Sequence, residues 1–387
     1  MTIAPCPLIE VSGPPHARGV QHGQQAAARI RLGIAHYAAQ ISKAGLDEAG
    51  LAALVADYVP LMQRFDPAHV EEMHGIAQGA DVPFAHIALL NARTEILKLA
   101  SRPDLRARLA EAAAPDGCTS VVVLPDAARD RRMIHAQNWD WKAECVDTAI
   151  VLRIRRDDGP DILTFTEAGG LARSGLNGAG VAITANYLES DRDYRSAGVP
   201  LALIRRRVLE QAHGALAMRA VYATPKSAAN NMTVSASVPD GQAVVVNFEC
   251  APDEAFQVFA QGGLLTHSNH FTSPVALAKL RDTGLANTPC SIYRDMRVRD
   301  LLAGRVGAIT PDDVKAALFD DFASPWSVCR PPRRGVSESG GDSATVAMIV
   351  MEPALGVMDV AMLPARNRVF TRFSLAGGPA VQQAAAA

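Results

Sequence analysis

The chain has 387 residues, of which 49% are hydrophobic and 20% charged, and its formal net charge is −2. This length and composition are typical of a globular protein with one large or two smaller domains around a sizeable core. The small net charge, without a basic cluster interleaved with aromatic residues, argues against binding to nucleic acid. The short arginine groups at 205–207 and 333–334 are interpreted as solvated faces or helix ends.

The N-terminal residues 1–13 lack the basic segment and apolar run of a secretory signal, and no apolar run is long enough to span a bilayer. We therefore expect a cytoplasmic protein that does not associate with a membrane. The six cysteines are scattered without a C-x-x-C pair, which argues against zinc ribbons and disulfide staples. We expect most of them to be buried free thiols, and we expect no metal or other cofactor.

The first third of the chain shows apolar positions at helical spacing, which predicts an all-helical segment. The helices are expected near 14–42, 46–64, 67–79, 84–98 and 103–113. In the third of these, His69 and His74 flank two glutamates. Five residues place the histidines about 140° apart around a helix, whereas ligands of one zinc ion need the same face. This part of the sequence is therefore interpreted as a solvated helix face.

From Cys118 onward the pattern switches to short β-branched runs with turns between them. Strands are expected at 118–124, 132–138, 148–155, 161–167, 179–188, 230–238, 242–250, 256–260, 344–351, 356–363 and 369–374. Helices are expected within 200–223, at 291–304 and at 311–322, and the tail 382–387 is expected to be frayed. This order predicts an α+β fold in which sheets are layered with helices.

The boundary between the two patterns is the dipeptide Gly117-Cys118. A thiol after a glycine can attack the preceding carbonyl, and hydrolysis of the resulting thioester would cut the chain. The product is a cysteine whose own α-amine, with a reference pKa of about 7.7–8.0, can act as a general base. A lone cysteine that opens an apolar strand is also typical of a small buried hydrophobe, so the dipeptide alone leaves both interpretations open.

Four downstream stretches add to this boundary: Gln137-Asn138-Trp139-Asp140-Trp141; Thr166–Gly169 running into Asn177–Val181; His267-Ser268-Asn269-His270; and Ser327–Arg330 followed by Ser343–Thr345. In this order they resemble the family of acyl-coenzyme A:6-aminopenicillanate (isopenicillin N) acyltransferases. Members of that family are cysteine N-terminal-nucleophile hydrolases whose precursor cuts itself at a Gly-Cys bond. The resemblance covers nearly the whole chain and includes the helical segment before Cys118.

The resemblance implies a four-layer αββα sandwich, with residues 1–117 as a pro-segment that becomes a second chain after autocatalytic cleavage of this zymogen, and 118–387 as the catalytic domain. It implies that Cys118 is the nucleophile, that Asp140 orients its α-amine, and that Asn269 donates to the oxyanion. Further candidates for substrate binding are Trp139, Arg173, Asn186, Asp342 and Ser343.

One position departs from the family pattern. The related acyltransferases carry a Ser-Arg pair just before Gly-Ala-Thr, whereas this chain has Asp342-Ser343 before Ala344-Thr345. The charge expected near the site is thereby reversed. An acid at this position suits a substrate with a cationic amine part better than a penicillin or a coenzyme A thioester.

Three functions agree with these residues. The first is a self-processing cysteine amidohydrolase that cleaves a small N-acyl amide or peptide-like bond through a Cys118 thioester. The second is an N-acyltransferase that moves an acyl group, from a coenzyme A thioester or an amide, to an amine. The third is a non-catalytic relative that binds a ligand in the same pocket. The first two share every catalytic residue and differ only in the acceptor of the acyl group.

Overall fold

Two β-sheets form the centre of the protein. The structure is a computed structural model that describes residues 3–43, 47–97, 117–238, 240–333, 343–378 and 380–384. In the described residues, sheet A has the strand order β1 (Leu8–Ser12), β4 (Ala149–Arg155), β5 (Ile162–Glu167), β6 (Ser174–Asn177), β7 (Val181–Tyr187), β8 (Asn230–Ser237), β9 (Ala243–Cys250) and β10 (Ala255–Val258). Sheet B has the order β11 (Leu264–His267), β2 (Gly117–Val123), β3 (Ile134–Lys142), β12 (Ser343–Glu352), β13 (Val357–Met362), β14 (Val369–Ser374) and β15 (Val381–Ala384).

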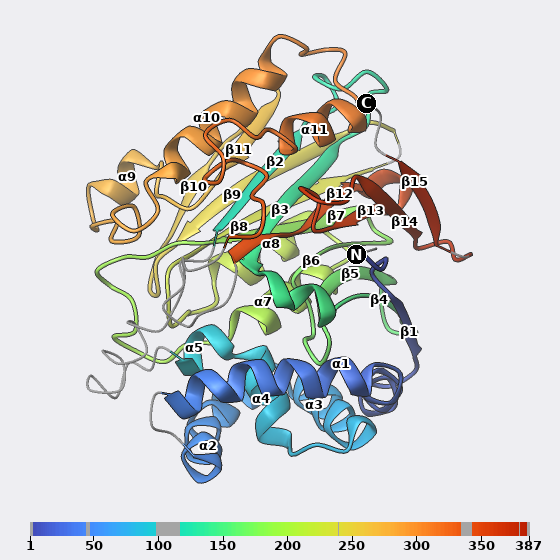
Figure 1. The fold of residues 1–387 in the computed structure, drawn as a ribbon, viewed down its shortest axis with the longest axis vertical. Helices are drawn as coiled ribbons and strands as arrows, with labels where there is room; N and C mark the ends of the chain where they lie inside the picture. The colour runs from blue at the N-terminus through green and yellow to red at the C-terminus, as the bar shows by residue number, and fades with distance from the viewer. Residues whose placement is uncertain are drawn as a thin grey trace.

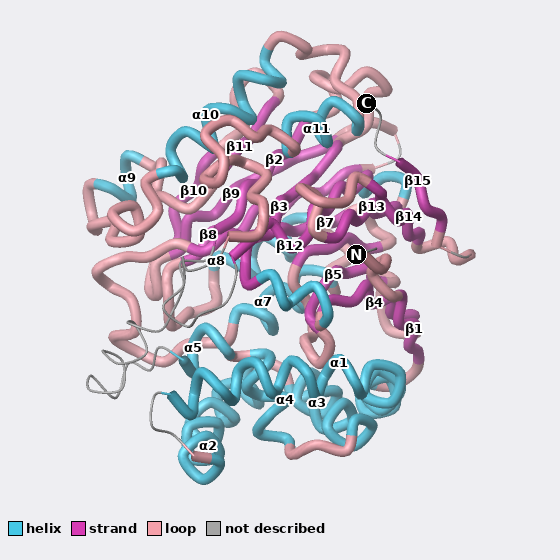
Figure 2. The backbone as a smooth tube through the Cα atoms, in the orientation of Figure 1, coloured by secondary structure: helices cyan, strands magenta, loops and turns pink. Residues whose placement is uncertain are grey.

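The helices precede, interrupt and follow these strands (Figure 2). Their bounds are α1 (Pro15–Lys43), α2 (Glu48–Phe65), α3 (Pro67–Ala80), α4 (Phe84–Asn91), α5 (Arg93–Leu97), α7 (Leu201–Leu209), α8 (Gly214–Tyr222), α9 (Pro274–Leu277), α10 (Cys290–Ala303) and α11 (Pro311–Leu318). Two 3₁₀ turns, η1 (Ala143–Asp147) and η2 (Pro353–Leu355), complete the described elements. The helix predicted at 103–113 lies outside the described residues.

The sheets are stacked face to face, and helices cover the outer face of each (Figure 1). Between the sheets, Phe165 of sheet A shares a core with Trp139 and Ile349 of sheet B. Helices α1 to α4, α7 and α8 pack on the outer face of sheet A, and α10 and α11 pack on that of sheet B. The central strands, such as β2, β7 and β12, thus bury both faces, which explains the continuous apolar runs in the sequence. The predicted α+β fold with four αββα layers is confirmed.

The prediction that the first third is entirely helical is wrong at its start. Residues Leu8–Ser12 form β1, which pairs in parallel with β4 at the edge of sheet A. The short alternation of buried Ile9 and Val11 with exposed Glu10 and Ser12 is a half-buried strand pattern. Residues before Cys118 therefore contribute a strand to sheet A as well as the helical layer.

Three further strands, β15, β6 and β11, were not predicted from the sequence. The tail predicted to be frayed forms β15 over Val381–Ala384, which pairs with β14. All four of its side chains are exposed, so no apolar pattern marked it, and backbone pairing alone defines the strand. The four-residue strands β6 and β11 were also missed, because runs of this length carry little periodicity.

The interpretation of α3 as a solvated face is wrong for Glu72 and His69. The arginines at 205–207 lie at a helix end, as one of the two alternatives predicted, but Arg206 is fully buried and not solvated. Glu72 is 1% exposed and accepts from Arg18 Nε at 2.6 Å and from Arg206 Nη2 at 2.8 Å. His69 is also fully buried and lies 3.0 Å from Glu210 of the segment after α7. Its neighbour His74 is exposed. These ion pairs join the helical N-terminal layer to α7.

Asp66, His69 and Glu210 place their ligand atoms within 4.8 Å of one another, as a metal site would. Both carboxylates are already paired, Asp66 with Arg207 and Glu210 with Arg206 Nε at 3.0 Å. The positive charge of the two guanidiniums fills the role that a cation would have, so the group is an ion-pair network. None of the described helices is long and apolar enough to cross a bilayer.

Candidate active site

Cys118 is the second residue of β2, which lies between β11 and β3 in sheet B. Its side chain is fully buried, and its cross-strand partner is Trp139. The following residues Val121, Val122 and Val123 are β-branched and fully buried, which anchors the strand between a helix layer and the neighbouring sheet. The six cysteines are all buried free thiols, as predicted.

The backbone N–H of Cys118 donates to Oδ1 of Asn269 at 2.8 Å. The same oxygen accepts from Arg294 Nη2 at 2.8 Å, while Nδ2 of Asn269 donates to the carbonyl of Tyr187 at 2.9 Å. An arginine can only donate, so its contact fixes which end of the Asn269 amide faces Cys118. The side-chain oxygen of Asn269, and not its NH₂ group, therefore faces Cys118. The predicted donation by Asn269 to an oxyanion stays a prediction.

Arg294 is the functional candidate that the sequence did not reveal. It is fully buried in α10 and donates from Nη1 to the carbonyl of Cys118 at 2.7 Å and to Thr119 Oγ1 at 2.8 Å. Burial and the like charge of Arg330 lower its pKa. One signal could have found it: Arg294 lies three residues after Ser291 and four before Val298, on the buried stripe of its helix.

Asp140 lies opposite Gly117 in the ladder between β2 and β3. Its Oδ1 accepts from Thr345 Oγ1 at 2.6 Å, and its Oδ2 lies 3.3 Å from Arg330 Nε and 4.0 Å from Arg294 Nη1. Among the described residues, Oδ2 has no hydrogen-bond partner of good geometry. A carboxylate oxygen is therefore available next to the bond between Gly117 and Cys118.

Only glycine fits at position 117, because the side chains of Asp140 and Arg330 occupy the space that a Cβ atom would need. A Cβ atom at Gly117 would lie 2.8 Å from Oδ2 of Asp140 and 2.5 Å from Nη1 of Arg330. Both are closer than side chains tolerate, and both side chains are buried and held by other contacts. The absence of a side chain therefore lets the backbone before Cys118 approach the Asp140–Arg330 ion pair.

A second buried pair, His267 and Glu249, lies beside the turn that carries Asn269. His267 Nε2 lies 2.8 Å from Glu249 Oε1, and both side chains are fully buried. Burial acts to lower the pKa of His267, but the hydrogen bond and charge of Glu249 outweigh it and raise that pKa. Asn186 donates to the carbonyls of His267 and Ser268 at 2.9 Å each and so fixes the turn that carries Asn269. These are positioning contacts.

The other predicted substrate-binding residues divide between the core and a cavity. Trp139 is fully buried between the sheets, and the Arg173 guanidinium stacks on its ring at 4.3 Å. Ser343 opens β12 and pairs its backbone with Arg333. Asp342 lies outside the described residues. Asn186 and Arg173 line a cavity of about 50 Å³.

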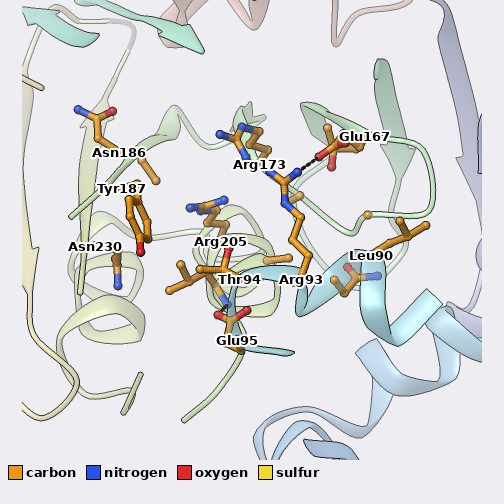
Figure 3. A pocket seen from close by; sticks show the side chains of 17 residues that line it. Leu90, Arg93, Thr94, Glu95, Glu167, Arg173, Asn186, Tyr187, Arg205 and Asn230 are labelled. Carbon is orange, nitrogen blue, oxygen red and sulfur yellow. Dashed lines mark hydrogen bonds and ion pairs between the residues drawn. The ribbon is translucent and has the colours of Figure 1, made fainter. Parts of the chain in front are cut away.

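This cavity lies between the helical N-terminal layer and sheet A (Figure 3). Arg93, Thr94 and Glu95 of α5 form one wall, and Asn186 and Tyr187 of β7 form another. The cavity is next to Cys118, because the Tyr187 carbonyl binds Asn269 and Asn186 Nδ2 lies 3.2 Å from Ser120 Oγ on the strand of Cys118. Residues on both sides of Gly117 thus contribute to one pocket.

Comparisons with known proteins place the chain in a family. Residues 127–362 match the model of the family described as acyl-coenzyme A:6-aminopenicillanic acid acyl-transferase. The acyl-coenzyme A:6-aminopenicillanic-acid-acyltransferase 40 kDa form of Emericella nidulans is 30% identical over 337 residues, covering 85% of this chain and 86% of that protein.

Among solved structures, a variant of conjugated bile acid hydrolase from Clostridium perfringens is similar with a TM-score of 0.46 and 12% identity, over 69% of this chain and 97% of that one. Penicillin V acylase from Agrobacterium tumefaciens is similar with a TM-score of 0.40 and 15% identity, over 63% of this chain and 83% of that one.

Four αββα layers, with a buried cysteine after a glycine in a central strand, are the arrangement of an N-terminal-nucleophile hydrolase. Within that class, the chain belongs to the acyl-coenzyme A:6-aminopenicillanic acid acyl-transferase family. It is therefore an enzyme of amide cleavage or acyl transfer, and the alternative of a non-catalytic relative is set aside.

Proposed function

We propose that the protein is a self-processing cysteine amidohydrolase that cleaves a small N-acyl amide or peptide-like bond through a thioester on Cys118. One observation carries the proposal: the nitrogen of Cys118 is held by Asn269 Oδ1 at 2.8 Å while Asp140 lies opposite the preceding Gly117. The group that must become the α-amine base is thus already oriented beside a carboxylate before the chain is cut.

Self-cleavage follows from these contacts. The sulfur of Cys118 attacks the carbonyl carbon of Gly117, a C–S bond forms and the C–N bond breaks, and the thiol proton goes to the departing nitrogen. Water then hydrolyses the thioester, leaving a carboxylate on Gly117 and a free amine and thiol on Cys118. The buried guanidiniums of Arg294 and Arg330 stabilise negative charge that develops on sulfur or oxygen during these steps.

Turnover repeats this chemistry on an external amide. The α-amine of Cys118 takes the thiol proton as sulfur attacks the substrate carbonyl, and it then gives the proton to the leaving amine. Asn269 Oδ1 keeps the amine in place, and the carboxylate of Asp140 stabilises its protonated form. Water hydrolyses the acyl-enzyme and restores the thiol.

The second candidate is an N-acyltransferase on the same residues, with a coenzyme A thioester or an amide as the acyl donor. The family match favours this candidate, since the 30% identical protein of Emericella nidulans is named as an acyltransferase. The two candidates differ in whether water or an amine accepts the acyl group from Cys118. Competition between water and an added primary amine, followed by mass spectrometry of the products, separates them.

The proposal has three further parts. Residues 1–117 become a separate chain that stays bound, because β1 and the Glu72 ion pairs tie this segment to the rest of the protein. The protein works in the cytoplasm. Asp342 favours substrates with a cationic amine part, a role that stays a prediction from the sequence alone.

The direct test is mass spectrometry of the purified protein together with a screen of N-acyl amides for release of free amine. We expect two fragments divided between Gly117 and Cys118, and amide hydrolysis that requires Cys118. Cys118→Ala should remain one chain, whereas Cys250→Ala, which removes another buried thiol, should be cut normally. Cleavage of Cys118→Ala at the same bond would show that this thiol does not process the chain.

A further inference from the structure

Asn269 is held at its backbone as well as at its side chain. Its N–H donates to the hydroxyl oxygen of Ser291 at 2.6 Å. Ser291 is the second residue of α10 and is fully buried, and the same helix carries Arg294, which binds the side-chain oxygen of Asn269. The beginning of α10 therefore holds, at two points, the residue that contacts the nitrogen of Cys118.

The hydroxyl of Ser291 has a second contact. Nδ1 of His270 lies 2.7 Å from the same oxygen, and within the described residues Ser291 Oγ has no third hydrogen-bond partner. A hydroxyl has one proton to donate, and a backbone N–H can only donate. All three groups are satisfied when the N–H of Asn269 donates to Ser291 and the Ser291 hydroxyl donates to Nδ1 of His270. His270 is then a neutral imidazole with its own proton on Nε2.

The neighbouring His267 has the opposite arrangement. Its Nδ1 lies 2.9 Å from the carbonyl oxygen of Ser268, and its Nε2 lies 2.8 Å from Oε1 of Glu249. A carbonyl and an ionised carboxylate can only accept, so both ring nitrogens of His267 need a proton. His267 is therefore a cation that Glu249 neutralises.

The charges around His270 favour its neutral form. Its ring stacks on that of His267 with the centroids 6.2 Å apart, so a second cation would lie against the first. Burial, and after it the charge of His267, lower the pKa of His270. Three carboxylates act in the opposite direction, namely Glu249 of β9, Asp282 of the segment after α9 and Asp295 of α10, but they do not reverse the shift. Two adjacent histidines with opposed environments thus have different protonation states.

We propose that Ser291 and His270 are a positioning pair for Asn269, in which neutral His270 accepts the Ser291 proton and so orients the oxygen that holds the Asn269 backbone. The inference rests on the proposed function, in which Asn269 holds the nitrogen of Cys118. Protonation of His270 would place a proton on Nδ1, and Ser291 would lose the acceptor for its own proton. Asn269 would then be held less firmly, and the reaction would slow at acid pH.

The first test does not need turnover. In the uncut Cys118→Ala chain labelled with ¹⁵N-histidine, NMR reports which ring nitrogen carries a proton. The signals that disappear when His270→Asn is added identify His270. At neutral pH its proton should be on Nε2, with Nδ1 bare. A proton on Nδ1, in the other neutral form or in the cation, would overturn the inference.

The second test is the pH profile of kcat/KM on an amide that the cut enzyme hydrolyses. Protonation of the Cys118 α-amine alone gives an acid limb with a logarithmic slope of about one. The wild-type limb should become steeper as His270 gains its proton. In His270→Asn the slope should stay at about one, because the side-chain oxygen replaces Nδ1 as an acceptor and does not titrate.

The control for this profile is His213→Asn, an exposed histidine before α8, which should keep the steeper limb. Limbs of the same shape in the wild type and His270→Asn would contradict the positioning pair.

The third test removes the hydroxyl. Ser291→Ala should lower kcat by roughly three- to tenfold with little change in KM, because the pair holds Asn269 and not the substrate. Ser291→Thr keeps a hydroxyl and should recover part of the loss. An unchanged kcat in Ser291→Ala would reject the pair, and if that variant does not fold, the first two tests decide. If the wild type hydrolyses no amide, the proposed function fails, whereas the protonated nitrogen of His270 in the first test still decides the inference.

Discussion

The nitrogen of Cys118 and the side-chain oxygen of Asn269 are joined by a 2.8 Å hydrogen bond in the uncut chain. Cleavage would convert the donor from an amide to an amine without removing its partner. Arg294, which donates to the same oxygen, keeps that oxygen turned toward Cys118. If the chain is cut at this bond, the contact would hold the new amine from the moment it forms, which makes the role of Asn269 testable.

We expect Asn269→Ala to fold and to lose roughly 10²–10³ in turnover, the scale for one catalytic hydrogen-bonding group. Asn269→Asp keeps an oxygen toward Cys118 but loses the Nδ2 donor to Tyr187. If the oxygen holds the amine, Asn269→Asp should be cut faster than Asn269→Ala, as measured by denaturing electrophoresis over time. Equal rates in the two variants would favour the donor role instead.

Asp140→Asn should impair both self-cleavage and turnover, because both depend on the same carboxylate beside Gly117. It also leaves Arg330 buried without its ion pair, which costs about 3–5 kcal/mol of stability. Asp359→Asn is a matched control, since Asp359 is a buried carboxylate of sheet B paired with Lys315 and Arg372. Both variants should melt earlier, but only Asp140→Asn should lose processing. Normal processing of Asp140→Asn would remove Asp140 from the mechanism.

Glu95 should make the folded state less stable as pH rises. Burial raises its pKa from 4.5 to about 7, so the folded chain holds a proton that the unfolded chain releases. Stability from this group is complete below pH about 4.5 and is lost as pH rises through about 7, in total about 3 kcal/mol. Arg205 and Arg93 face Glu95 and act in the opposite direction.

Urea unfolding at pH 5 and pH 7 measures this change, in the Cys118→Ala background so that the chain stays single. Glu95→Gln should lose clearly less stability over this interval than the parent, because its amide does not titrate. The same loss in both proteins would show that the pKa of Glu95 is not raised.

Glu72 should hold the N-terminal fragment on the rest of the protein. It is buried between Arg18 of the same segment and Arg206 of α7. Glu72→Gln leaves the buried guanidinium of Arg18 without a carboxylate and leaves Arg206 with Glu210 alone, a cost of about 3–5 kcal/mol. Fragment 1–117 should then separate in gel filtration of the cut protein, whereas Glu71→Gln, an exposed neighbour, should retain it. Retention in both variants would assign the attachment to β1 and the apolar contacts instead.

Local patterns in the sequence were sufficient to predict most of the fold. Helical spacing before residue 98 and β-branched runs after Cys118 predicted most of the described helices and strands, because a buried helix face and a buried strand each require a fixed apolar period. The motifs around Cys118, Asp140 and Asn269 directed attention to one site, and the roles of these three residues stay predictions. Strands β1 and β15, defined largely by pairing, were not predicted.

Only the tertiary structure decided what the charged residues do. Arg206 and Glu72 have the sequence pattern of a solvated surface, but both are buried where α7 and α3 are joined by their ion pair. Arg294 has no neighbour in sequence that explains it, since its partners Cys118 and Asn269 lie 176 and 25 residues away. Burial of a charge depends on which distant segments meet, whereas an apolar period depends only on the local backbone. The sequence therefore determined the layers and singled out Cys118, and the packing of the layers determined which charges surround it.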